Sequence, residues 1–253
     1  MKADFGKTAD DYRKHRAGFP DSFFEELQKR GLIRGFEKVA DIGTGTGTVA
    51  RGLAEIGCEV VGVDPSQDMI SAAATIAEEQ GLVIDWLQAS AEDTGLAEHS
   101  IDVVSAGQCW HWFDHRKAVE EVKRILKPGG LLLIAHFDWL PIQDSVVWNT
   151  EQLIQETNPD WELGGRIGIY PEWFRHLYEG GFSDVSSFTY YEPVEYSHEA
   201  WRGRIRASAG IGGSLSKEEV LAFDVKHEAM LKNDFPEDPL SVPHQVFVIY
   251  GRK

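Results

Sequence analysis

The sequence predicts an α/β fold in which helices cover both faces of a doubly wound, mostly parallel sheet. Short apolar runs alternate with segments of helical periodicity between residues 36 and 138, and strands that alternate with helices fold into parallel sheets. A glycine-rich turn, Gly43-Thr44-Gly45-Thr46-Gly47, follows the first apolar run. The chain has 253 residues and can bury a large core, so we expect a single domain over residues 1–253.

Periodicity and end signals locate the helices. Residues 21–32 carry apolar side chains at near-helical spacing, with Asp21 as the candidate N-cap. Gly57 and Gly81 end two crossover helices, and a later helix stops before Pro128. The helices are expected over residues 21–32, 46–56, 66–80 and 114–126.

Apolar runs bounded by turn residues locate the strands. Two of them flank the glycine-rich turn and the helix that follows it, and a third comes after the next helix. Two more runs near the C-terminus read as closing strands. The strands are expected near residues 39–42, 60–64, 83–89, 182–191 and 245–250.

The glycine-rich turn is a candidate ligand site. Glycine carries no Cβ, so Gly43, Gly45 and Gly47 let the backbone turn sharply and approach a ligand closely. Asp64 ends the second strand, where an acidic residue of such folds accepts hydrogen bonds from a ribose diol. Together these features predict a cofactor that contains adenosine.

Two residues discriminate between the classes of cofactor. The dinucleotide fingerprint requires glycine three positions after Gly45, and this chain has Thr48 there. Asp41 lies two positions before the first glycine, where its charge repels a pyrophosphate but suits a cationic amino group or sulfonium. The segment from Asp41 to Gly47 resembles motif I of the class I S-adenosylmethionine-dependent methyltransferases. A dehydrogenase is the more distant alternative.

The resemblance to this family covers residues 36–138. Residues 64–70, Asp-Pro-Ser-Gln-Asp-Met-Ile, are similar to the family's second-strand end. Residues 90–93 resemble the turn after the third strand, although many relatives have Asp in place of Ser90. Residues 100–106 and 124–134 resemble the fourth strand and the helix, Pro-Gly-Gly turn and fifth strand. The resemblance implies a Rossmann-like sheet of seven strands with an antiparallel strand near the C-terminus.

The resemblance also implies contacts to the cofactor, S-adenosylmethionine. Asp41 is expected to orient the methionine moiety, Asp64 to bind the ribose, and Met69 to pack on adenine. The expected cofactor contacts are Asp41, Gly43, Thr44, Gly45, Gly47, Asp64, Pro65, Met69, Ala91, Glu92, Gln108, Tyr12 and Arg16.

A narrower resemblance lies in residues 108–113, Gln-Cys-Trp-His-Trp-Phe. This segment is similar to the Gln-x-x-His-Trp-Phe segment of the trans-aconitate methyltransferase group and its uncharacterised bacterial relatives. Residues 5–20 also fit that group, in which they cap the methionine end of the cofactor. In a helix, Tyr12 and Arg16 would lie one turn apart and close over the cofactor. The resemblance implies a small-molecule acceptor.

Residues 139–180 and 194–240 are longer than ordinary connections, so we expect them to contain structure of their own. We interpret them as helical lids at the carboxyl edge of the sheet, with residues 36–138 as the cofactor-binding core and residues 1–35 as a helical cap. Aromatic side chains suit a dry pocket for a small organic molecule, although ordinary packing is favoured for any single tryptophan. The candidate substrate contacts are Trp110, Trp112, Trp139 and Arg202.

The predicted chemistry is attack by an acceptor on the sulfonium methyl group. A carboxylate acceptor needs no base, whereas a hydroxyl or carbon acceptor does, and His111 is then the candidate general base. His111 equally suits a loop-fixing hydrogen bond. Arg202, Arg204 and Arg206 form a basic cluster that suits either a carboxylate substrate or salt bridges to neighbouring acids.

Composition and charge argue against several classes of partner. The formal net charge is −16, which opposes binding to a nucleic-acid backbone or an anionic membrane. The N-terminal residues lack a signal-peptide pattern. Cys58 and Cys109 show neither disulfide nor metal-ligand spacing, so we expect a cytoplasmic protein without a metal site.

Two alternatives to a small-molecule methyltransferase remain open at this point. One is carbon methylation of a quinone-like or other lipophilic ring, which predicts an apolar pocket with few cations. The other is a binding module for S-adenosylmethionine without turnover. The sequence makes no prediction of the oligomeric state.

Overall fold

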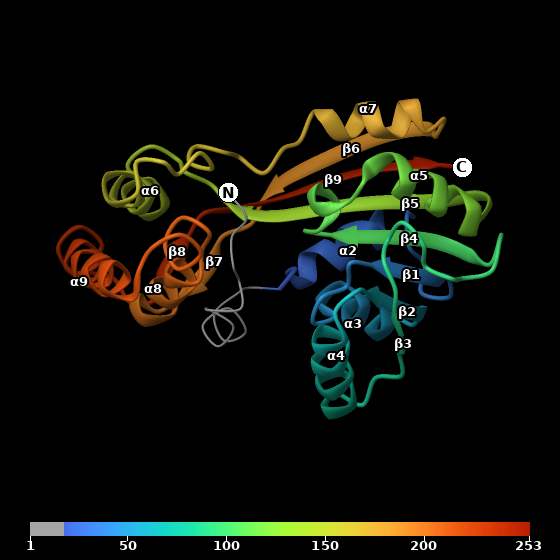
Figure 1. Ribbon diagram of the computed structural model, residues 1–253, viewed down its shortest axis with the longest axis horizontal. Helices are drawn as coiled ribbons and strands as arrows, with labels where there is room; N and C mark the ends of the chain where they lie inside the picture. The colour runs from blue at the N-terminus through green and yellow to red at the C-terminus, as the bar shows by residue number, and fades with distance from the viewer. Residues whose placement is uncertain (1–17) are drawn as a thin grey trace. The chain divides into compact units, whose positions relative to one another are not determined.

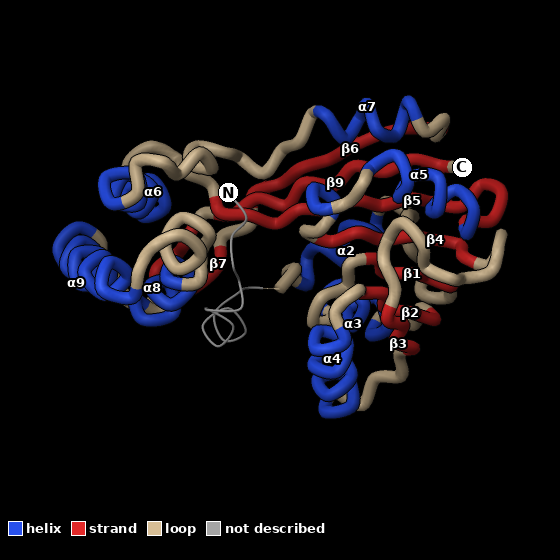
Figure 2. The backbone as a smooth tube through the Cα atoms, viewed as in Figure 1, coloured by secondary structure: helices blue, strands red, loops and turns tan. Residues whose placement is uncertain are grey.

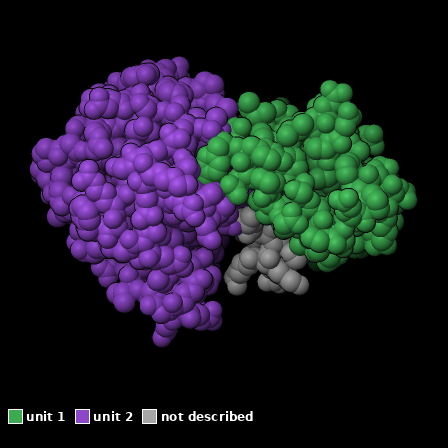
Figure 3. Space-filling model, turned by 180° about the vertical axis from the view of Figure 1, so that it is seen from behind, with its two compact units in different colours: residues 1–17, 138–168, 190–245 green, residues 18–137, 169–189, 246–253 purple. Residues whose placement is uncertain are grey.

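The computed structural model describes residues 18–253, which form two compact units (Figure 3). Unit 2 comprises residues 18–137, 169–189 and 246–253. The described part of unit 1 comprises residues 138–168 and 190–245. Tyr12 and Arg16 lie outside the described residues, and their predicted contact with the cofactor stays a prediction.

Unit 2 is built on a seven-stranded sheet with the strand order β3-β2-β1-β4-β5-β9-β6 (Figure 1). The pairs β1–β2, β1–β4, β2–β3 and β4–β5 are parallel, and one strand of the sheet is antiparallel. This arrangement confirms the predicted fold class. The strands are β1 (Lys38–Ile42), β2 (Glu59–Asp64), β3 (Asp85–Gln88), β4 (Ile101–Gly107), β5 (Leu126–Trp139), β6 (Ser183–Tyr191) and β9 (His244–Arg252).

Helices cover both faces of this sheet (Figures 1 and 2). On one face lie α2 (Asp21–Lys29), α3 (Thr48–Glu55) and α4 (Gln67–Glu79). On the other lie α5 (His115–Ile125) and α7 (Glu172–Glu179), which contact each other. Apolar side chains of the central strands fill the space between sheet and helices, and Trp110 and Trp173 are the largest members of that core. Burial of these side chains supplies the main driving force for the unit.

Several predicted boundaries differ from the structure. Pro20, with φ −70° and ψ 158°, occupies the N-cap of α2, so Asp21 is the first helical residue rather than the cap. The third strand starts at Asp85 rather than residue 83, because pairing with β2 begins at Asp85 and Val83 is 90% exposed. The Pro-Gly-Gly segment lies inside β5, where the register against β4 shifts.

Unit 1 contains three helices in its described part, together with a two-stranded antiparallel sheet. Two of the helices, α6 and α8, pack on the third, α9. Their shared core is aromatic, with Trp201 and Phe223 fully buried. The elements are α6 (Val146–Thr157), α8 (His198–Arg206), α9 (Lys217–Asp234), β7 (Val194–Tyr196) and β8 (Leu240–Val242).

The predicted insertion over residues 139–180 divides between the units. Its first part carries α6 and belongs to unit 1, whereas α7 packs beside α5 in unit 2. The second insertion, residues 194–240, contains α8 and α9 and lies wholly in unit 1. The placement of these segments over the sheet edge stays a prediction. No helix among residues 18–253 is both long and apolar enough to cross a membrane.

Candidate functional site

The glycine-rich turn joins β1 to α3, and its three glycines all adopt positive φ, with 65° at Gly43, 55° at Gly45 and 79° at Gly47. A Cβ at Gly43 would lie 2.8 Å from the sulfur of Cys109, and a Cβ at Gly47 would lie 2.6 Å from the ring of Trp86. Nothing lies within 4 Å of a Cβ built on Gly45. Packing therefore requires glycine at the two outer positions, while the middle one faces open space in which a ligand can approach the backbone.

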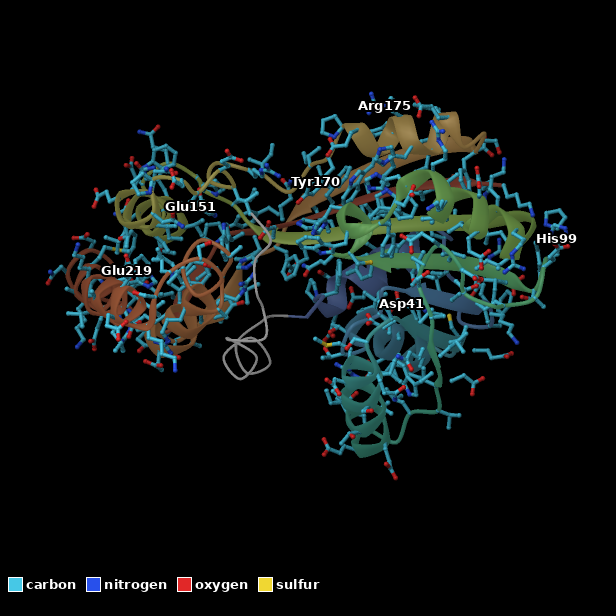
Figure 4. The ribbon with its side chains drawn as sticks, in the orientation of Figure 1. Asp41, His99, Glu151, Tyr170, Arg175 and Glu219 are labelled. Atoms are coloured by element: carbon cyan, nitrogen blue, oxygen red, sulfur yellow. The ribbon has the colours of Figure 1, made fainter. Side chains whose placement is uncertain are left out.

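Asp41 lies in β1, directly before this turn, and is 1% exposed (Figure 4). Its carboxylate accepts hydrogen bonds from the hydroxyl of Thr44 at 2.6 Å and from that of Ser105 at 2.7 Å. The second bond follows from register, because Asp41 is the partner of Ser105 in the β1–β4 pair. Burial raises the pKa of Asp41 to about 6. A neighbouring cation would stabilise the charged form and relieve this cost.

Asp64 ends β2 and is 8% exposed. One carboxylate oxygen accepts from the backbone N–H of Gly45 at 2.9 Å, and the other from that of Ser66 at 2.9 Å. An ionised carboxylate has about four lone-pair sites, so the two bonds leave acceptor capacity for a diol. The structure thus brings the predicted ribose acid against the predicted cofactor turn.

The residues predicted to surround adenine flank this pair. Met69 lies in the first turn of α4 with its side chain 38% exposed, and Pro65 is exposed beside it. Ala91 is buried. Glu92 accepts from the backbone N–H of Asp114, the N-cap of α5, at 2.9 Å. The exposed apolar surface of Met69 suits an aromatic ring, whereas the carboxylate of Glu92 has a structural partner.

The segment of residues 108–113 is fastened to the cofactor turn. The thiol of Cys109 donates to the carbonyl oxygen of Ile42 at 3.1 Å. Gln108 has a φ of 58°, in the left-handed region, and its side-chain amide donates to the carbonyl oxygen of Phe137 on β5. Strain of this kind persists where surrounding contacts over-determine the backbone. Gln108 therefore ties the ends of β4 and β5 together, and its contact with the cofactor stays a prediction.

The tryptophans of this segment differ from each other. Trp110 is fully buried, packs edge-on against Phe113, and donates through its indole N–H to His176 at 3.3 Å. Such a side chain serves the core of unit 2 and presents no surface to a substrate. Trp112, in contrast, is 67% exposed.

His111 is exposed and faces two residues that the sequence did not predict at the site. Its ring is parallel to that of Tyr170, with centroids 6.3 Å apart, and edge-on to that of His136, with centroids 6.0 Å apart. A hydrogen bond of 3.1 Å joins the Tyr170 hydroxyl to Nε2 of His136. His136 lies near the end of β5 and was detectable as a polar residue after an apolar run, but nothing in the sequence locates Tyr170 beside it.

The two candidate substrate residues of unit 1 have internal partners. Trp139 donates from its indole N–H to Glu151 at 2.8 Å (Figure 4 labels Glu151). Arg202 forms an ion pair with Asp224 and lies within 3.4 Å of Glu199 and 3.3 Å of Glu228. These carboxylates match the salt-bridge alternative, because they already pair with the guanidinium of Arg202. Among residues 18–253, no group of three or more His, Cys, Asp or Glu side chains is arranged to hold a metal ion.

Comparison with known proteins agrees with this geometry. A family model described as a methyltransferase domain matches residues 40–134, the stretch that holds Asp41, the glycine turn and Asp64. Residues 40–134 therefore match a methyltransferase domain. The cofactor of this domain is S-adenosylmethionine, and the open space at Gly45 and the spare acceptor sites of Asp64 fit it.

The methyltransferase domain also has similar curated and solved relatives. The chain is 31% identical over 170 residues to an uncharacterized methyltransferase of Mycobacterium tuberculosis, covering 66% of this chain and 60% of that protein. It therefore spans less than two thirds of that relative. The YcgJ protein of Bacillus subtilis is similar in structure, with a TM-score of 0.60, 23% identity, and coverage of 92% of this chain and 99% of that one.

A putative type II methyltransferase from Anaeromyxobacter dehalogenans gives a TM-score of 0.68 at 21% identity, covering 94% of this chain and 97% of that one. Identities this low establish the shared fold and not a shared acceptor.

Proposed function

We propose that this protein transfers the methyl group of S-adenosylmethionine to a small-molecule acceptor, and we favour a carboxylate as the acceptor class. One observation carries the proposal. The buried Asp41, the open position at Gly45 and the acceptor-rich Asp64 lie on adjacent strand ends, as a cofactor with a cationic end and a ribose requires.

Each part of this arrangement has a role in binding. The carboxylate of Asp41 orients the cationic methionine end, and the two oxygens of Asp64 accept from the ribose hydroxyls. Met69 supplies apolar surface for adenine. The bonds from Gly45 and Ser66 to Asp64 hold that carboxylate in place before the ligand arrives, which lowers the entropy lost on binding.

When bound, S-adenosylmethionine supplies an electrophilic methyl group on a sulfonium. The task of the protein is then to hold the acceptor in line and to exclude water. A carboxylate acceptor is already a nucleophile and needs no proton removed. For a hydroxyl or carbon acceptor, we propose His111 as the base, with Tyr170 and His136 beside it.

The proposal is tested first by calorimetry with S-adenosylmethionine and S-adenosylhomocysteine. Asp64→Ala should weaken binding at least tenfold, because charge-assisted hydrogen bonds are lost. The control is Asp85→Ala, which removes an exposed carboxylate at the first residue of β3 in the same unit. It should leave the affinity unchanged. Unchanged affinity in Asp64→Ala would remove the ribose assignment.

Turnover is tested separately, as formation of S-adenosylhomocysteine with a panel of small carboxylic acids, phenols and quinols. Methylation of the acids supports the favoured class, and methylation of quinols alone supports the lipophilic-ring alternative. Tight cofactor binding without product from any acceptor would favour the non-catalytic binding module.

A further inference from the structure

The three arginines of α8 have different surroundings, and the difference follows from helical geometry. Residues four apart lie on one face of a helix, whereas residues two apart are rotated by about 200°. Arg202 and Arg206 accordingly face α9, where both bond the carboxylate of Asp224. Arg204 points to the opposite side of α8, so it is outside this network.

Arg204 lies instead against an aromatic ring. Its guanidinium carbon is 4.8 Å from the centre of the Trp139 ring, a cation–π distance. The side chain is half-buried, and among residues 18–253 no carboxylate forms an ion pair with it. The N–H donors of its guanidinium are therefore available to an anionic ligand, in a chain that carries 41 acidic residues and 25 basic ones.

The ring under Arg204 is itself held in place. The indole N–H of Trp139 donates to one oxygen of Glu151 at 2.8 Å, and the other oxygen accepts from the backbone N–H of Gly165 at 2.8 Å. Glu151 is 5% exposed. Trp201 packs edge-on against the same ring, with centroids 5.5 Å apart. A guanidinium on such a platform loses little further freedom when it binds a ligand.

We propose that Arg204 and Trp139 form a recognition site for the carboxylate of a small organic acid. This inference rests on the proposed function, since it assigns the acceptor class. The planar fork of a guanidinium pairs with both oxygens of a carboxylate, and a fixed aromatic face restricts the orientation of that fork. Within the basic cluster, Arg204 is the residue that binds the carboxylate. Arg202 does not, because its donors already pair with carboxylates of unit 1.

The site is tested by calorimetry on the full chain, with benzoate, succinate and tricarballylate as probes and benzamide as the uncharged match of benzoate. We expect at least one acid to bind with a Kd in the millimolar range or tighter, and benzamide to bind at least tenfold more weakly than benzoate. Absence of binding by all three acids at 10 mM would overturn the site. Inorganic phosphate that binds as tightly as the acids would overturn the carboxylate assignment.

Variants locate the site within the chain. Arg204→Gln should lower the affinity for the acid at least tenfold, and Arg204→Lys should lower it less because charge remains while the fork is lost. Trp139→Leu should also weaken binding. The matched control is Arg166→Gln, which removes an exposed arginine of the same unit. Equal affinities for the wild type and all Arg204 variants, with unchanged circular dichroism, would contradict the assignment.

Failure of this inference is distinguishable from failure of the proposed function. S-adenosylhomocysteine binding, measured on the same samples, depends on Asp41 and Asp64 of unit 2 and not on Arg204. Cofactor binding with no acid binding overturns the recognition site alone. Acid binding with no cofactor binding overturns the proposed function and leaves Arg204 as a carboxylate site of another activity.

Discussion

Asp41 shows how a single residue can trade stability for function. Burial raises the pKa of its carboxyl group to about 6, from an ordinary value of 3.8. The folded state therefore holds a proton more tightly than the unfolded state, and stability falls as the pH rises from about 4 to about 6. Two pH units of difference correspond to about 3 kcal/mol. A bound cation would recover part of this cost.

The substitution Asp41→Asn tests that trade. An asparagine side chain does not titrate, so the variant should be more stable than wild type by about 1–3 kcal/mol at pH 8, and the difference should shrink toward zero near pH 4. Its affinity for S-adenosylmethionine should fall at least tenfold. Urea unfolding at several pH values and calorimetry measure both effects. A stability difference independent of pH would contradict the raised pKa.

Gly45 allows backbone strain to be separated from ligand contact. Gly45 and Gly81 have φ of 55° and 70°, and a Cβ added to either would have no atom within 4 Å. Alanine at either position should cost about 1–2 kcal/mol, because both force a side chain into the left-handed region. Only Gly45→Ala should also weaken cofactor binding, by at least tenfold. Similar cofactor affinities in both variants would show that the turn does not approach the ligand.

Among the elements, those predicted best are the ones whose ends carry local signals. An apolar run predicts β1, three glycines predict the turn, and helical periodicity predicts α3. The next apolar run predicts β2 and places Asp64 at its end. The cap of α2 was predicted wrongly because Asp21 and Pro20 both favour a helix start, and the structure uses Pro20 as the cap. Ser105, Tyr170 and the orientation of Arg204 depend on contacts between distant segments, which no local pattern encodes.

The start of α9 offers a prediction about a whole element. Ser216 accepts from the backbone N–H of Glu219 at 3.3 Å, and Glu219 accepts from that of Ser216 at 2.8 Å, forming a capping box. Ser216→Ala removes one half of it and should destabilise unit 1 by about 1 kcal/mol. Hydrogen exchange should show faster exchange in the first turn of α9. A comparable increase confined to unit 2 would contradict this assignment.

At the scale of the whole molecule, the two units differ in how protons affect them. Unit 2 contains Asp41, whose ionisation is unfavourable in the folded state. The described part of unit 1 contains two buried histidines, and burial lowers the pKa of His227 to about 3 and that of His244 to about 4. The chain is therefore expected to respond to acid unit by unit rather than uniformly.

The bonds of His227 explain why it resists protonation. The hydroxyl of Thr150 donates to the carbonyl oxygen of Val146, so its oxygen accepts a hydrogen bond of 3.1 Å from the N–H at Nε2 of His227. Nδ1 is buried and has no hydrogen-bond partner among the described residues. A proton added there would create a buried charge without an acceptor, which is costly. His244 donates from Nδ1 to the carbonyl oxygen of Val242 at 3.0 Å, also inside unit 1.

Unit 1 should consequently lose stability as the pH falls below about 6.5. In this range the two histidines become protonated in the unfolded chain but stay neutral in the folded unit. Each histidine contributes about 1.4 kcal/mol per pH unit between its unfolded and folded pKa, so several kcal/mol are lost by pH 4. Hydrogen exchange at pH 7 and 5 should show protection in α9 falling more than protection in β1 and β4. His227→Gln should make protection in α9 less dependent on pH. The control is His99→Gln, which replaces a histidine of unit 2 and should leave that dependence unchanged. Equal loss of protection in both units would contradict the assignment to His227 and His244.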